Sequence, residues 1–66
     1  MTNPLDDTLA ALQKIQDAID TVKTKKTITP EKQILQDYDK IISHLEDSAS
    51  SLINVVVIFW KHEKLL

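Results

Sequence analysis

Hydrophobic residues recur every three or four positions along two stretches of this chain, the spacing expected of amphipathic helices. In the first stretch, polar residues such as Lys14 and Asp17 fall on the opposite face, which predicts a helix over residues 4–24. Asn3 and Pro4 suit its N-cap and first turn. Its apolar positions are Leu5, Leu9, Leu12, Ile15, Ile19 and Val22.

The second stretch is longer and predicts a helix over residues 30–63. Thr29 is the expected N-cap, Pro30 the first helical residue and Glu31 part of the first turn. The segment before it is rich in threonine, a β-branched residue that disfavours helix, so residues 25–29 are the predicted turn. The apolar positions of the second helix are Ile34, Leu35, Tyr38, Ile41, Ile42, Leu45, Ala49, Leu52, Val56 and Phe59.

Two helices joined by a short connection predict an all-α fold, an antiparallel two-helix hairpin of coiled-coil type. The pattern shows no internal repeat and no domain boundary, so residues 1–66 are expected to form one hairpin domain. Its second helix is expected to be the longer one.

The densest apolar run, SLINVVVIFW at residues 51–60, admits two other interpretations. Its valines favour a strand, but no other segment alternates with period two and could pair with it. A membrane span needs about 20 apolar residues, whereas this run is interrupted by Asn54 and ended by KHEK. We therefore expect helix here and no membrane span.

If the second helix continues through this run, its last turns are apolar on almost every side. Val57 and Ile58 fall on faces that are polar in the preceding turns, where Ser43, Ser50 and Ser51 lie. One shorter helix cannot cover all these sides, and such a patch marks a protein-binding surface. The expected contact residues are Leu52, Ile53, Val56, Val57, Ile58, Phe59 and Trp60.

Composition narrows the class of protein. Eight Lys or Arg against ten Asp or Glu give a net charge of −2, which is unlike the basic surface of a nucleic-acid binder. There is no Cys, which removes disulfides and thiolate metal sites. The start of the chain lacks the features of a signal peptide, so a cytoplasmic location is expected. A chain this short buries a marginal core, which again favours a partner.

No catalytic, cofactor or metal site is predicted. The sequence contains no Gly, the residue on which phosphate loops and nucleophile elbows depend. His44 and His62 lie about 27 Å apart on a helix with a rise of 1.5 Å per residue, too far to share a metal. Carboxylates such as Asp6 and Glu46 have no neighbours that would perturb them. We expect a protein that is not an enzyme and needs no cofactor.

The proline-started second helix, TPEKQILQDY, and the later segment HLEDSASSLINVV resemble the small co-chaperone of the type III secretion needle subunit. The resemblance rests on hairpin size and on this composition pattern. It implies a bacterial, cytoplasmic virulence protein that pairs with a larger helical-repeat chaperone. Together the two would keep the secreted needle subunit from polymerising early.

Three other hypotheses remain open. A small helical inhibitor, antitoxin or immunity protein would show the same pattern, and so would a hairpin that associates with itself. A homodimeric RNA-binding hairpin has the same length, but it needs a basic face with stacking aromatics. In this chain the lysines are dispersed or gathered near the turn.

Overall fold

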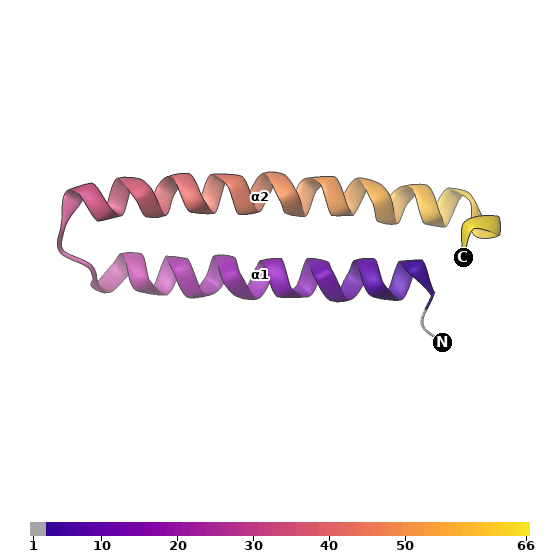
Figure 1. The fold of residues 1–66 in the computed structure, drawn as a ribbon, viewed down its shortest axis with the longest axis horizontal. Coiled ribbons are helices and arrows are strands. Elements are labelled where there is room, and N and C mark those ends of the chain that lie inside the picture. Colours follow the sequence, from indigo (N-terminus) through magenta and orange to yellow (C-terminus); the bar gives the residue numbers. More distant parts are fainter. Residues whose placement is uncertain (1–2) are drawn as a thin grey trace.

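A computed structural model describes residues 3–66, which form two antiparallel helices side by side in a rod 50 Å long (Figure 1). Helix α1 spans Pro4–Ile28 and helix α2 spans Lys32–Lys61, followed by the short 3₁₀ helix η1 at Glu63–Leu65. The all-α hairpin with a longer second helix is confirmed, and the run from 51 to 60 is helical throughout.

Asn3 caps α1 as the sequence predicted. Its side-chain Oδ1 accepts a hydrogen bond of 2.8 Å from the backbone N–H of Asp6, and its backbone oxygen accepts from Asp7 at 3.2 Å. Pro4 occupies the first turn, where its missing N–H costs nothing. Asp6 and Asp7 place negative charge at the positive end of the helix dipole.

The predicted turn at 25–29 is wrong, because α1 continues to Ile28. Threonine hydroxyls donate back to carbonyl oxygens of the preceding turn, from Thr24 to Asp20 at 2.9 Å and from Thr29 to Lys25 at 2.7 Å. These bonds are compatible with helix and occupy carbonyls near its end. The threonine-rich segment is therefore accommodated in α1, which continues past residue 24.

Pro30 ends the first helix instead. A residue that precedes proline is pushed out of the helical region, and Thr29 is extended, with φ −97° and ψ 120°. The predicted roles of Thr29 as N-cap and Pro30 as first helical residue are therefore wrong. The N-cap of α2 is Glu31, whose backbone oxygen accepts from the N–H of Leu35 at 3.1 Å.

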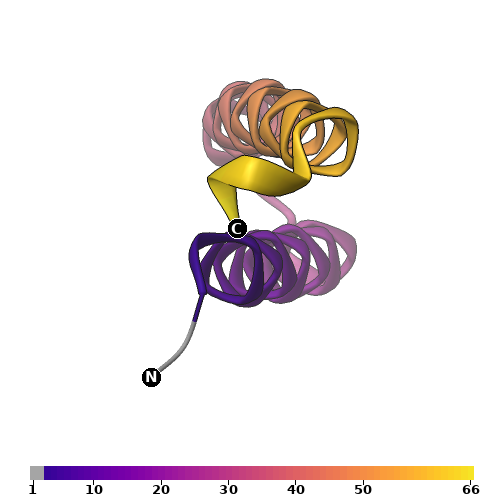
Figure 2. The ribbon, with the colours of Figure 1, turned by 90° about the vertical axis from the view of Figure 1, so that its right-hand side faces the viewer.

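The C-terminal end of α2 also differs from the predicted boundary at residue 63. Helix α2 ends at Lys61, and the N–H of His62 donates to the carbonyl oxygens of Ile58 at 3.0 Å and Phe59 at 3.2 Å. The chain then turns into η1, which lies across the open end of the hairpin. Seen along the rod, the C-terminus approaches the first turn of α1 (Figure 2).

The inward-facing residues of both helices follow a strict three-four spacing, the heptad pattern of a coiled coil. Each of these positions is buried or half-buried. On α1 they are Leu5, Thr8, Leu12, Ile15, Ile19, Val22 and Lys26; on α2 they are Leu35, Tyr38, Ile42, Leu45, Ala49, Leu52, Val56 and Phe59.

The core between the helices is thin. Ile19, Ile42, Ala49 and Val56 are its buried members within residues 3–66. Lys26 of α1 and Asp39 of α2 form an ion pair across the helices near the loop. The hairpin therefore depends on one row of apolar contacts, with little burial on either side of it.

Candidate protein-binding surface

The structure divides the seven predicted contact residues into two groups. Val56 is buried in the hairpin, and Leu52 and Phe59 are half-buried in the same inward row. These three side chains pack against α1, so little of their surface is left for a partner. The exposed members are Ile53, Val57, Ile58 and Trp60.

Three of the exposed residues form a row on one flank of α2, which we call the Trp60 flank. Ile53, Val57 and Trp60 are separated by four and three residues, so they lie in line along the helix. Ile53 is 49% exposed and Trp60 is 64% exposed. This flank presents a continuous apolar strip beside the core rather than isolated hydrophobic residues.

A shallow groove of about 340 Å³ runs between the helices beside this strip. Its floor is formed by the buried side chains of Ile19 and Ala49, and the small alanine leaves room above it. Lys23 and Glu46 line the groove from opposite helices at the end nearer the loop. The remaining lining residues are Gln16, Ser50 and Ile53.

Apolar residues are also exposed on the other flank of α2. Ile41, Val55 and Ile58 lie there, with Ile58 52% exposed. The sequence pattern placed Ile41 among the inward residues, but its position at the edge of the heptad row leaves it partly in solvent. Helix α2 therefore has two apolar flanks on either side of the row that contacts α1.

Sequence reasoning missed Leu9 and Val55 as surface residues. Leu9 belongs to the apolar pattern of the first helix, yet it is exposed beside the inward row near the open end of the hairpin. Val55 sits within the apolar run but was not assigned to the surface. The three-four spacing of the inward row separates both residues from the core once the position of the other helix selects that row.

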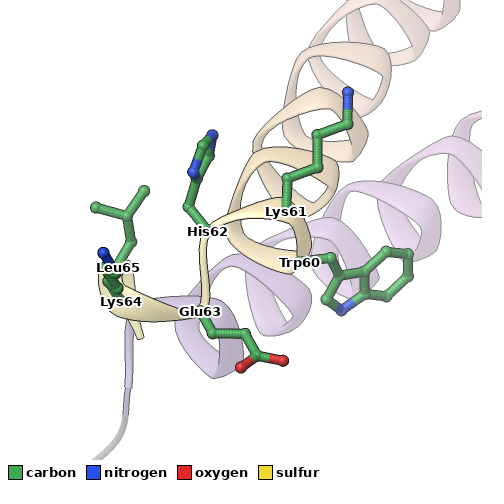
Figure 3. A pocket seen from close by; sticks show the side chains of 6 residues that line it. All are labelled: Trp60, Lys61, His62, Glu63, Lys64 and Leu65. Atoms are coloured by element: carbon green, nitrogen blue, oxygen red, sulfur yellow. The ribbon is translucent and has the colours of Figure 1, made fainter.

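A second hollow, of about 610 Å³, surrounds the break between α2 and η1. It is lined by six consecutive residues, Trp60 to Leu65, and no other part of the described chain contributes. Their side chains fan outward, with Trp60 and Glu63 on one side and Lys61 and His62 on another (Figure 3). Because these groups do not converge, the hollow is an open surface and not a ligand site.

Chemistry-bearing side chains are scattered over the rod. Within residues 3–66, no group of three His, Asp or Glu side chains is placed to hold a metal ion. His44 lies outward on α2, and His62 lies beyond its end. The exposed apolar residues are therefore the distinguishing feature of the described surface, on which reactive groups do not cluster.

Helix α2 is long and apolar enough to cross a membrane by length and composition alone. Its best stretch of 18 residues has a mean hydropathy of 1.3, and 17% of that stretch is buried in the hairpin. Every stretch of 18 residues within α2 includes Glu46 and Asp47, both exposed. The apolar residues that give α2 this hydropathy include those exposed on its two flanks.

Comparisons of the chain with protein-family models, curated proteins and solved structures find no match. The hairpin and its two apolar flanks are therefore the features from which a function can be proposed.

Proposed function

We propose that this chain is a non-catalytic, cytoplasmic helical module that binds another polypeptide through the C-terminal half of α2. The observation that carries the proposal is the exposure of Ile53, Val57, Ile58 and Trp60 on a helix whose inner row is already covered. Burying one such side chain fully stabilises an association by about 1.5–3 kcal/mol. Several together supply the apolar centre that a protein interface needs.

The heptad geometry indicates what kind of partner fits. A helix with apolar residues on both sides of its inward row can pack against two neighbours, and α1 supplies one of them. A partner helix lying along either flank would meet side chains spaced three and four residues apart. We therefore propose a helical partner surface.

The co-chaperone resemblance is a finer form of this proposal. In that form, the partner is a larger helical-repeat chaperone, and the pair holds a secreted needle subunit. The exposed flanks of α2 are compatible with such a partner. The proposal of protein binding does not depend on this identification.

The test uses the pair of apolar residues on the otherwise polar outer faces of α2. Val57→Ser with Ile58→Ser should weaken binding to a partner polypeptide reconstituted from purified components, by at least tenfold in Kd. The matched control is Ile28→Ser, an exposed isoleucine at the loop end, which should leave Kd unchanged. Equal binding by all three proteins would overturn the proposal.

A charge variant separates protein from nucleic-acid partners. Lys14→Gln with Lys25→Gln removes two exposed charges and leaves the ion pair of Lys26 intact. Protein binding should persist in this variant. Salt-sensitive binding of RNA by the original chain, lost in the variant, would contradict the proposal because phosphate contacts respond to lysine charge.

A further inference from the structure

The exposed area of the hairpin is larger than a folded monomer of its mass should have. The chain of 7.5 kDa exposes 5210 Å². Surface scaling for compact monomers gives about 4,200 Å² for this mass. The excess of about 1,000 Å² is close to the ~800 Å² that each partner buries in a standard protein interface.

The Trp60 flank and its groove are complementary to themselves. Near the open end, the surface is apolar, with Leu9 on α1 and Ile53, Val57 and Trp60 on α2. Asp6 is exposed at its edge, and so is Glu63, on the same side as Trp60 (Figure 3). Two copies can bring the apolar residues together while these carboxylates stay at the rim of the contact. A two-fold interface requires such a self-complementary patch, because the same patch meets itself.

The loop end of the same face carries charges of opposite sign on the two helices. Lys23 lines the groove from α1, and Glu46 lines it from α2. Asp39 lies seven residues before Glu46, on the same side of α2. Asp20 lies at the outer edge of this side of α1, in solvent. The face thus changes along the rod from apolar at the open end to mixed charge at the loop end.

We propose that two copies of this chain pack groove to groove as parallel hairpins, with the two-fold axis along the helices, to form a four-helix bundle. The inference rests on the binding surface of the proposed function and names a second copy as the occupant of the Trp60 flank. The opposite flank, with Val55 and Ile58, remains free for another polypeptide.

The pattern of charge and apolar residues selects the parallel arrangement. With the axis along the rod, α1 of one copy lies opposite α2 of the other at the same level. Leu9 then faces the Trp60 flank of the partner subunit, and Lys23 faces Glu46 of the partner subunit. An axis across the rod would set the apolar end of one copy against the charged loop end of the other, or would shorten the overlap.

The first experiment measures the mass of the full chain by sedimentation equilibrium. The expected result is one species of twice 7.5 kDa. Ile53→Ser with Trp60→Ser should raise the dimer dissociation constant at least tenfold. The matched control, Val55→Ser with Ile58→Ser on the other flank, should leave it unchanged.

A distance measurement keeps the inference testable if the first double variant fails to fold. The chain has no Cys, so Gln36→Cys introduces one spin-label site near the loop on the groove side. With helices spaced 8–10 Å apart, parallel hairpins should hold the two labelled positions within about 20 Å. Antiparallel hairpins in full overlap would bring position 36 of one copy level with position 57 of the other, about 32 Å away along the rod at a rise of about 1.5 Å per residue.

Several outcomes would overturn the inference. These are a monomer, a larger or polydisperse assembly, a dimer lost only in the Val55 and Ile58 variant, and a long label distance. A monomer that still binds a different polypeptide through Val57 and Ile58 would remove the self-association and leave the proposed function standing.

Discussion

Ile19 of α1 and Ala49 of α2 line the same groove between the helices, although each is almost completely buried in the hairpin. The two residues therefore belong both to the core and to the floor of the exposed face. Because the core is a single row of side chains, the surface proposed to bind a partner lies directly on the residues that hold the hairpin together.

Shortening Ile19 should destabilise the hairpin far more than shortening an exposed isoleucine. Ile19 is 4% exposed, and Ile19→Ala should lower the free energy of unfolding by about 2–5 kcal/mol, enough to unfold a chain this small. Ile28 is 71% exposed, and Ile28→Ala should change it by less than about 0.5 kcal/mol. Urea unfolding followed by far-UV circular dichroism, at one fixed protein concentration, compares the two variants. Equal losses would contradict the assigned core.

The Lys26–Asp39 ion pair should contribute little to stability. The lysine side chain is 41% exposed and the aspartate side chain is 58% exposed, so water and salt screen their attraction. A double-mutant cycle with Lys26→Gln and Asp39→Asn should give a coupling energy below about 1 kcal/mol, falling further in high salt. A larger, salt-independent coupling would mean that the pair is more shielded than the structure shows.

Removing the N-cap of α1 should weaken the first helix. Asn3→Ala removes the oxygen that accepts from the N–H of Asp6 and should lower the free energy of unfolding by about 0.5–2 kcal/mol. Asn3→Asp is the matched control, because a carboxylate keeps the acceptor and suits the helix dipole. Chemical unfolding of both variants provides the measurement, and a neutral alanine variant would show that the cap is dispensable.

Helix α2 should not insert into a lipid bilayer despite its apolar composition. Glu46 and Asp47 fall within every stretch of it long enough to span, and a charged residue inside a spanning helix is unfavourable, by up to about 2.5–3.5 kcal/mol at the bilayer centre. The chain should therefore stay with the aqueous fraction when zwitterionic vesicles are floated. Glu46→Leu with Asp47→Leu should increase the fraction that floats. If the original chain floats with the vesicles, the apolar flanks bind a membrane and the proposal of a protein partner is contradicted.

The sequence by itself determined the helical hairpin, the N-cap at Asn3 and the apolar outer faces at Val57 and Ile58. These features follow from spacing along one helix and from contacts between residues close in sequence, which local geometry fixes. The sequence pattern did not determine where the two helices end near the loop. There, α1 continues through the threonine-rich segment, whose Thr24 and Thr29 hydroxyls donate to carbonyls of the preceding turn, and Pro30 stops it.

Only the tertiary structure decided which apolar residues are covered. Leu52, Val56 and Phe59 turn toward α1, while Ile53, Val57 and Trp60 are exposed on one flank, where Ile53 lines the groove. Neighbouring residues in one apolar run differ in this way because burial depends on where the second helix lies. That position is set by packing over the whole length of both helices, which no short stretch of the sequence contains.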